Sequence, residues 1–388
     1  MNPFPAIAIG GPPHSGKSVL TYNLTQILRT QQVEHYVLRA CPDGEGDWSQ
    51  ETPPETVRLL RNKGQFTDTF VDNVCRALQQ RHLPLLVDVG GRPTPEQEII
   101  FDYCTHAILL APNEAGLSQW RVLTQRHKLP LLAELQSTLT ESEAIYGEYP
   151  ILRGRIAGLE RQQQARGTLV DLLAWNIRTL FFLHQQNLRA EHLRAAPAEV
   201  TVELDRLART LGLAAGDVWQ PAELPAVLDY LPAKEPLAIY GRGPNWLYAA
   251  LAAHTYPASF YQFDARLGWV TPPPLHATAA PDSTHVKVQL LESADHDILQ
   301  MHILDTYLDY SEAPSISVPP VSAHRGLIIH GKLPHWLVTG LVRSYPSTSW
   351  LAVYHPPLQA SIVVASQSAT HPIGKIIPGP SLPASESK

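Results

Sequence analysis

The stretch GGPPHSGKSVLTYNL, from Gly10 to Leu24, decides the fold of the N-terminal part of the chain. An apolar run at Ala6–Ile9 precedes it, and its second half has apolar residues at helical spacing. A glycine-rich turn between a strand and a helix presents backbone N–H groups to a phosphate at the positive end of the helix dipole. The pattern G-x-x-x-x-G-K-[ST] in this setting predicts a nucleotide-binding loop.

Two side chains of this loop have predicted contacts with the nucleotide. Lys17 can reach the β- and γ-phosphates, and the Ser18 hydroxyl can hold Mg²⁺. A chance glycine turn is the alternative. The predicted nucleotide-binding residues are Gly11, Ser15, Gly16, Lys17, Ser18, Val19, Asp88 and Gly91.

Asp88 ends the apolar run LPLLVDV within Leu83–Gly91, as expected of a strand buried on both faces of a parallel sheet. It lies where a metal-side carboxylate belongs, so Ser18 and Asp88 are the predicted metal ligands. The segment Asp88-Val89-Gly90-Gly91 also fits D-x-x-G, in which a glycine N–H can sense the γ-phosphate. The alternative for Asp88 is a turn residue at a strand end.

Further apolar runs alternate with helical patterns and predict an α/β domain with a doubly wound parallel sheet over residues 1–190. This part resembles P-loop NTPases in general. The run His106–Ala111 continues into PNEA rather than N-K-x-D, which favours ATP over GTP. Nothing here names a phosphoryl acceptor, so a kinase, a hydrolysing switch and a nucleotide-sensing module all stay open.

The composition bounds the class of protein. A net charge of −6 over 388 residues argues against binding of long nucleic acid through a large basic surface. Cys41, Cys75 and Cys104 have neither disulfide nor zinc spacing and suit a reducing cytoplasm. The apolar stretch Leu169–Asn187 contains Asp171, Asn176 and Arg178, so we expect no membrane span. With no basic leader visible, we expect a cytoplasmic protein.

The C-terminal half contains one stretch twice. LAIYGRGPNWL (Leu237–Leu247) aligns without a gap with LIIHGKLPHWL (Leu327–Leu337). Each copy continues as a strand, a glycine turn, a short helix, a Tyr-Pro turn and a second strand. We therefore expect a linker at Arg189–Pro197 and then two tandem small α+β domains, residues 198–292 and 293–388, packed as a pseudo-two-fold pair.

The copies differ at three positions. Arg242, Asp264 and Arg266 of the first copy align with Lys332, His355 and Pro357 of the second. Asp and Arg two residues apart at a strand end would lie on one face and could act on one ligand. A surface salt bridge is the alternative. Trp246 and Trp336 occupy equal places and are better explained as core residues than as adenine stackers.

GRGPNWL followed by FYQFDARLG is similar to the signature of the CRISPR-associated Csx-three family. The resemblance implies two ring-nuclease-like domains that cleave cyclic tetra-adenylate to linear di-adenylate and switch off type III CRISPR signalling. It also implies a long form with a fused P-loop ATPase domain. By this resemblance Asp264 is the catalytic acid residue and Arg266 faces the phosphate. The implied ligand-binding turn is Gly241, Arg242, Gly243 and Pro244.

The family also uses histidines, and here this chain departs from it. Pro257 stands where the first histidine belongs, so His254 and His276 are the predicted acid–base residues. The missing histidine could instead come from another chain or from the second copy, which offers His324, His330, His335 and His355. The resemblance further implies a head-to-tail homo-oligomer around the ligand and, besides ATP and Mg²⁺, Mn²⁺ as a candidate at the nuclease site.

Three functions follow from these motifs. The first is a ring nuclease with an ATP-binding domain. The second is a cyclic-oligoadenylate-sensing ATPase switch without nuclease activity, and the third is a P-loop kinase of unknown small substrate. The sequence decides neither the role of ATP hydrolysis, nor the oligomeric state, nor whether the second copy binds ligand.

Overall fold

The computed structural model describes residues 4–42, 47–53, 55–57, 66–91, 93–161, 167–182, 188–213, 219–279, 281, 283–304 and 307–379. The chain divides into two compact units. The first contains Met1–Glu51, Gln65–Glu191 and Ala265–Gly268, and the second contains Thr52–Gly64, His192–Asp264 and Trp269–Lys388. No helix in the described part of the chain is long and apolar enough to cross a membrane.

The first unit is built on a seven-stranded sheet with the order β2-β3-β1-β4-β5-β7-β6. All neighbouring pairs run parallel except β6 with β7. The strands are β1 (Ala6–Gly10), β2 (Tyr36–Ala40), β3 (Leu85–Val89), β4 (His106–Ala111), β5 (Leu131–Thr138), β6 (Ala144–Gly147) and β7 (Leu152–Ala157).

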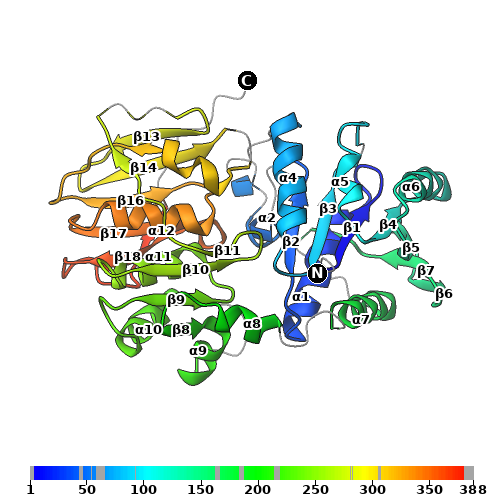
Figure 1. Ribbon diagram of the computed structural model, residues 1–388, viewed down its shortest axis with the longest axis horizontal. Coiled ribbons are helices and arrows are strands. Elements are labelled where there is room, and N and C mark those ends of the chain that lie inside the picture. The colour runs from blue at the N-terminus through cyan, green and yellow to red at the C-terminus, as the bar shows by residue number, and fades with distance from the viewer. Residues whose placement is uncertain are drawn as a thin grey trace. The chain divides into compact units, whose positions relative to one another are not determined.

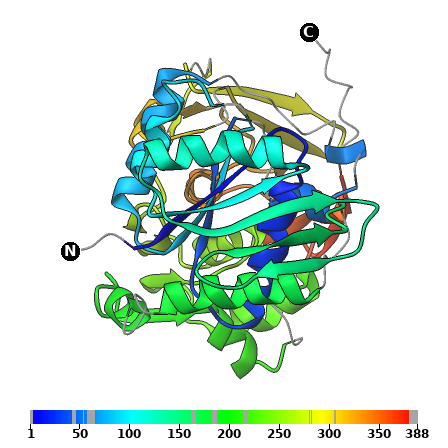
Figure 2. The same cartoon turned by 90° about the vertical axis from the view of Figure 1, so that its right-hand side faces the viewer.

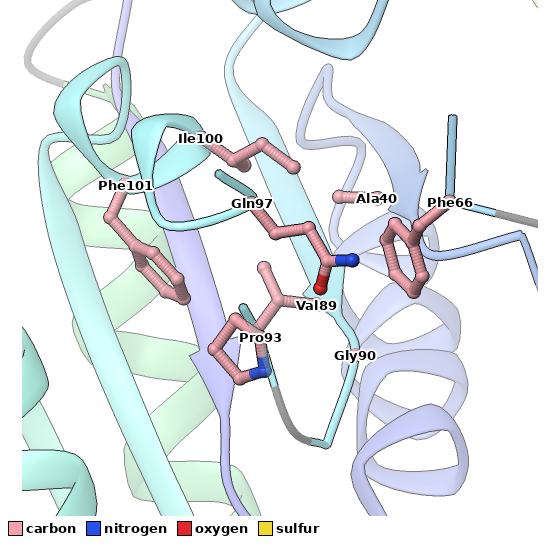
Figure 3. A pocket seen from close by; sticks show the side chains of 8 residues that line it. All are labelled: Ala40, Phe66, Val89, Gly90, Pro93, Gln97, Ile100 and Phe101. Carbon is pink, nitrogen blue, oxygen red and sulfur yellow. The ribbon is translucent and has the colours of Figure 1, made fainter. Parts of the chain in front are cut away.

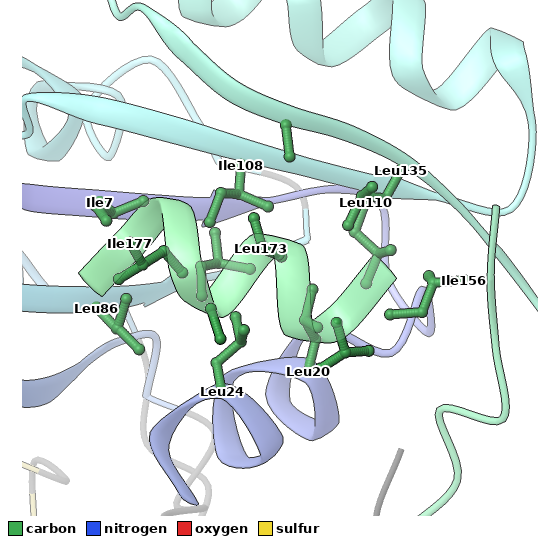
Figure 4. Packing of buried hydrophobic residues seen from close by; sticks show 14 of the residues in the cluster. Ile7, Leu20, Leu24, Leu86, Ile108, Leu110, Leu135, Ile156, Leu173 and Ile177 are labelled. Atoms are coloured by element: carbon green, nitrogen blue, oxygen red, sulfur yellow. The ribbon is translucent and has the colours of Figure 1, made fainter. Parts of the chain in front are cut away.

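Helices cover both faces of this sheet (Figures 1 and 2). They are α1 (Lys17–Thr30), α2 (Asp47–Glu51), α4 (Asp68–Gln80), α5 (Ile99–Asp102), α6 (Glu114–Arg126) and α7 (Thr168–Phe182). The α1 and α7 helices bury their apolar faces against the strands in one continuous core, in which Leu20, Leu24, Leu173 and Ile177 are fully covered (Figure 4). Burial of this apolar surface fixes the first turn of α1 at the carboxyl end of β1.

The predicted doubly wound parallel sheet is confirmed for this unit, with two additions. The antiparallel edge strand β6 was not expected, because AIYG is too short to give a periodic signal. The predicted linker at Arg189–Pro197 is wrong in its first part, since α8 spans Leu188–Arg194. Its composition of Leu, Arg, Ala and Glu favours a helix.

The first repeat of the second unit contains a four-stranded sheet with the order β11-β10-β9-β8. The pairs β8–β9 and β9–β10 are parallel, and helix α11 connects β9 to β10. Its elements are β8 (Val200–Glu203), α9 (Leu204–Thr210), η1 (Pro221–Glu223), α10 (Leu224–Tyr230), β9 (Leu237–Tyr240), α11 (Asn245–His254), β10 (Phe260–Asp264), β11 (Gly268–Val270) and β12 (His276–Ala277).

The second repeat has a six-stranded sheet with the order β13-β14-β16-β17-β18-β19. Strands β14, β16 and β17 are parallel, as β8, β9 and β10 are in the first repeat. Its elements are β13 (Val286–Glu292), β14 (His296–Ile303), η2 (Tyr310–Ser315), β15 (Ser317–Val318), β16 (Gly326–His330), α12 (His335–Ser344), β17 (Trp350–His355), η3 (Pro356–Leu358), β18 (Ala360–Ser366) and β19 (Ile376–Pro378).

The two repeats belong to one compact unit. Strand β13 forms an antiparallel hairpin with β14, so a boundary between residues 292 and 293 falls inside that hairpin. The short strand β12 of the first repeat pairs with β15, which precedes the core of the second repeat. The chain segments before β14 therefore contribute to both sheets.

Helices α11 and α12 lie side by side and point the same way. At their N-terminal ends, Asn245 Nδ2 donates to the Leu333 carbonyl at 3.0 Å. At the other ends, the Arg343 guanidinium donates to the Ala252 and Ala258 carbonyls at 3.0 and 2.8 Å. Because both helices follow a parallel strand, both glycine turns lie at the same end of the unit.

Replacing Arg343 with alanine should destabilise this unit. Its guanidinium also donates to the Thr255 hydroxyl and the Pro257 carbonyl, and its half-buried site leaves these acceptors without another donor in easy reach. We expect a loss of about 2 kcal/mol in the free energy of unfolding, measured by urea titration. Arg209→Ala removes an exposed pair with Asp205 and should change stability by less than about 0.5 kcal/mol. Equal effects of the two changes would contradict the role given to Arg343.

Candidate functional sites

The nucleotide-binding loop of the first unit joins β1 to α1. Gly16 caps α1 with a left-handed φ of 91°, and a Cβ there would come within 3.0 Å of Leu159. At Gly11 a Cβ would lie 1.8 Å from the Leu110 carbonyl oxygen of β4. Both glycines are therefore required by geometry, and the loop passes closer to the neighbouring strand than another residue would permit.

Lys17 is buried and its ammonium group lies on the loop itself. Its Nζ donates to the Gly11 and Pro12 carbonyls at 2.9 and 2.8 Å. The positive charge is thus held where the backbone N–H groups of the loop converge. This arrangement supports the predicted contact of Lys17 with phosphate oxygens.

Ser18 and Asp88, the predicted metal ligands, lie together. Ser18 Oγ donates to Asp88 Oδ2 at 2.8 Å, and the adjacent strands β1 and β3 place Asp88 opposite Ile9. Asp88 is buried. A hydroxyl and a carboxylate beside a phosphate site are the donors that protein-bound Mg²⁺ uses, so the residues fit this ion.

Arg39 is a neighbour of this pair that sequence reasoning missed. It lies opposite Asp88 on β2, and its guanidinium forms an ion pair with Asp88 Oδ2. The motif pattern gave no signal for it, because the contact depends on which strand lies beside β3. A divalent cation at Asp88 would compete with this guanidinium.

The remaining predicted residues support a phosphate cradle. Ser15 is 3% exposed, and its hydroxyl has no hydrogen-bond partner within the described structure. A Cβ at Gly91 would lie 2.5 Å from the Pro13 nitrogen, so the D-x-x-G segment touches the loop. Val19 is a buried residue of the core under α1. A buried polar atom and closely packed glycines are what a phosphate-binding loop requires.

A small hollow of about 220 Å³ adjoins the D-x-x-G segment (Figure 3). Val89 and Gly90 form one side, and Phe66, Gln97 and Phe101 lie around it. Its walls are mostly apolar. It belongs to the same unit as the nucleotide-binding loop.

In the second unit, strand registers relate the two repeats residue by residue. Leu237 of β9 pairs with Phe260, and the equivalent Leu327 of β16 pairs with Leu351. Counting along β10 and β17 from these pairs brings Asp264 and His355 to the same point. The register therefore agrees with the sequence alignment of these two residues.

Asp264 ends β10 at the same edge as the glycine turn. Gly241 has a positive φ of 112°, and its carbonyl accepts a hydrogen bond of 2.5 Å from Tyr248 Oη. Burial and, to a smaller degree, the charge of Asp264 raise the pKa of Tyr248. Tyr248 thus links the turn to the carboxylate.

The other members of the turn are placed as predicted. Arg242 is exposed, and Pro244 caps the first turn of α11. Gly243 packs tightly, since a Cβ there would lie 3.0 Å from Leu204. The turn offers an exposed cation beside free N–H groups of a helix start.

The expected pairing of Asp264 and Arg266 on one strand face is wrong. Strand β10 ends at Asp264, and the following residues form a turn, so the two-residue alternation of a strand does not apply. The segment Ala265–Gly268 belongs to the first unit, where the Arg266 guanidinium lies 5.8 Å from the centroid of the Tyr36 ring.

The structure does not bring His254 to Asp264. His254 ends α11 and contacts the Leu231 carbonyl at 3.1 Å. Since α11 leads into β10, this end of the helix lies near the start of β10, and Asp264 lies at the opposite end. His276 is exposed on β12, opposite Ser317 of β15.

The histidines of the second repeat have different surroundings. His330 is 3% exposed against Tyr354, with a ring distance of 4.4 Å, and burial lowers its pKa to about 4. Burial also lowers the pKa of His355 to about 4. His324 lies in an exposed turn, and exposed His335 begins α12. At neutral pH the second repeat therefore has an uncharged imidazole at the place of Asp264.

Trp246 and Trp336 are core residues, as predicted. They are 1% and 0% exposed, and Trp336 meets Tyr310 edge-on at 5.3 Å. Neither indole is available for stacking with a ligand base. Their equal places reflect the shared packing of the two repeats.

Comparison with known families gives one match, to the family described as CRISPR-associated protein (Cas_csx3), at residues 301–378. The C-terminal end of the chain is therefore a Cas_csx3 segment. It covers the second repeat from the end of β14 through β19, although the signature noted above lies in the first repeat. The sequence signature and the family match thus fall on different copies of the same strand–helix–strand segment.

A solved structure also resembles part of the chain: a nucleotide-binding protein from Archaeoglobus fulgidus in complex with ADP and with Co. The two are 11% identical with a TM-score of 0.26, and the similarity covers 46% of this chain and 88% of that one. No curated protein matches. The nucleotide site is therefore argued from its own geometry.

Lys17→Ala should abolish nucleotide binding without unfolding the first unit. The change removes the only side-chain cation that the loop carbonyls Gly11 and Pro12 are described as holding. We expect at least a hundredfold weaker binding of Mg·ATP by isothermal titration calorimetry. Lys128→Ala, remote from the loop in sequence and just after α6, is the control and should bind as the native protein does. Unchanged affinity in Lys17→Ala would exclude this loop as the phosphate site.

Arg39→Ala should make stability more dependent on Mg·ATP. Removing the guanidinium leaves Asp88 buried beside Ser18, and breaking a buried pair costs about 3 kcal/mol. A bound divalent cation would replace the lost charge. We expect a lower Tm without ligand and a larger rise with Mg·ATP than in the native protein, measured by differential scanning fluorimetry. An unchanged rise would show that Arg39 does not compete with the cation.

Proposed function

We propose that this chain is a ring nuclease that cleaves cyclic tetra-adenylate to linear di-adenylate and so ends type III CRISPR signalling, with an attached unit that binds ATP and Mg²⁺. The Cas_csx3 match at residues 301–378 carries this proposal. The first repeat has the same parallel strand–helix–strand arrangement and adds Asp264 beside the G-R-G-P turn. The fold of the family is thus present twice, and the acidic residue once.

The cleavage step uses a nucleophile that the substrate itself contains. The ribose 2′-OH attacks the adjacent phosphorus, the bond from phosphorus to the 5′-oxygen breaks, and a 2′,3′-cyclic phosphate forms. Asp264 accepts the proton of the 2′-OH. Arg242 and the N–H groups that begin α11 stabilise charge on the non-bridging oxygens, as does Arg266 by resemblance to the family.

A metal ion is not assigned to this step. No group of three or more histidine, cysteine or acidic side chains that could hold a metal occurs among the described residues. The donors beside Asp264 therefore do not fit a protein-held Mn²⁺ site. The mechanism accordingly uses proton transfer and hydrogen bonding alone.

The nucleotide-binding unit holds Mg·ATP through residues that already lie together. Lys17 and the loop N–H groups bind phosphate oxygens, and Ser18 and Asp88 hold the ion. When bound, Mg·ATP supplies a phosphoryl group that water or another acceptor can take. Gly91, packed on the loop, is placed to respond to the γ-phosphate. We propose a homo-oligomer in which copies of the second unit meet around the two-fold cyclic ligand.

The sensor function is the second candidate, and one observation favours it. The repeat that matches Cas_csx3 has the uncharged His355 where the first repeat has Asp264. A unit that binds the cyclic ligand without cleaving it would need the turns and not the carboxylate. A kinase with an unknown small substrate remains the third candidate, supported by the nucleotide-binding unit alone.

Incubation of the full chain with cyclic tetra-adenylate, with and without Mg·ATP, tests the proposal. We expect conversion to linear di-adenylate, followed by ion-pair chromatography, and at least a hundredfold slower conversion by Asp264→Asn, which keeps the side-chain shape. Asp229→Asn, on α10, is a control that should cleave normally. Binding without cleavage would support the sensor, and the absence of binding would leave a nucleotide-binding protein of unknown substrate.

A further inference from the structure

The turns of the two repeats lie next to each other. Asn245, the first residue of α11, donates to the Leu333 carbonyl in the turn before α12. The Tyr248 ring of α11 stacks at 4.5 Å from the ring of His335, the first residue of α12. The exposed cations Arg242 and Lys332 occupy the same place in the two turns. One end of the unit therefore presents two basic turns and two helix starts.

The packing of α12 on β10 fixes how far His335 lies along the strand. Thr339 Oγ1 donates to Gln262 Oε1 at 3.0 Å in the buried core. From Thr339, His335 lies one helical turn, about 6 Å, toward the shared end. From Gln262, Asp264 lies two residues, about 7 Å, toward the same end. The two side chains thus advance in step from one buried contact.

Tyr248 lies between them. Its hydroxyl is bound to the Gly241 carbonyl, its ring contacts His335, and Asp264 contributes to its raised pKa. The groups that face His335 are Tyr248 from α11, Asp264 from β10, and Arg242 and Lys332 from the two turns. His335 is exposed and reachable by a ligand, whereas His330 is buried against Tyr354.

We propose that His335 of the second repeat is a catalytic residue for the site of the first repeat and protonates the departing 5′-oxygen. The inference rests on the proposed nuclease function and supplies its missing acid. In the step, the 2′-OH proton passes to Asp264, the bond from phosphorus to the 5′-oxygen breaks, and the 5′-oxygen takes the proton of His335. Exchange with water restores both residues. The second repeat is then retained as part of the active site, although it has lost its own acidic residue.

His335→Asn tests this role with little structural change, because the first repeat has Asn245 at the same place. A general acid must be protonated, so its contribution is present at low pH and lost as the pH rises. We expect kcat to fall at least a hundredfold, KM to change less than about threefold, and the alkaline limb of the pH–rate profile to disappear. His371→Asn, which lies on Trp350 at the start of β17 and thus at the opposite edge of the sheet, should keep kcat and the profile.

The outcomes separate this inference from the proposed function. If the native chain cleaves cyclic tetra-adenylate and Asp264→Asn does not, but His335→Asn keeps both kcat and the alkaline limb, the inference fails alone. If the native chain does not cleave, both fail. His335→Gln serves as a second variant should His335→Asn unfold, and circular dichroism checks both. Restoration of cleavage by added imidazole would support the acid role.

Discussion

The parallel strand–helix–strand connection is the constraint on which every candidate site of this chain depends. A crossover helix must return over the sheet, so its first turn always begins at the carboxyl ends of the strands. Here β1, β9 and β16 each lead into such a helix, and a glycine with positive φ follows each strand: Gly11, Gly241 and Gly331. At Gly331 a Cβ would lie 2.3 Å from the Met301 carbonyl oxygen, as Gly11 approaches Leu110. Close approach to a neighbouring strand therefore fixes these turns before any ligand is considered.

Duplication of this connection has given two repeats that share packing and differ in charge. Tyr240 and Phe263 stack at 4.9 Å in the first repeat, and His330 and Tyr354 stack at 4.4 Å at the same places in the second. The aromatic contact is kept while the polar character changes. A carboxylate is kept only where the strand end faces the shared turns. Divergence at the surface with conservation of packing is consistent with a second copy that supports the first, since the core determines the fold and the exposed ends determine the chemistry.

Much of the fold and part of the site could be predicted from the sequence. Buried parallel strands give continuous apolar runs, so the runs at residues 83–91 and 106–111 identified β3 and β4. The position of Ser18 beside Asp88 follows from the motif, because the loop geometry is local. Arg39 could not be found, since its contact depends on strand order. Arg266 was misplaced because a strand end cannot be located to within two residues from pattern alone. His335 stood among four candidates that only the packing of α12 on β10 separates.

The two candidate carboxylates suit different chemistry because their surroundings differ. Asp88 is 1% exposed and lies against the Ser18 hydroxyl and the Arg39 guanidinium. A carboxylate held this way stays ionised and exchanges one cation for another, which is the behaviour a metal ligand needs. Asp264 is half-buried at an edge beside a tyrosine and exposed basic turns. A carboxylate reached by both water and ligand can take up and release a proton in each cycle, which a metal ligand cannot do. The fold thus repeats one loop geometry, and the depth of the neighbouring acid decides whether the loop serves an ion or a proton.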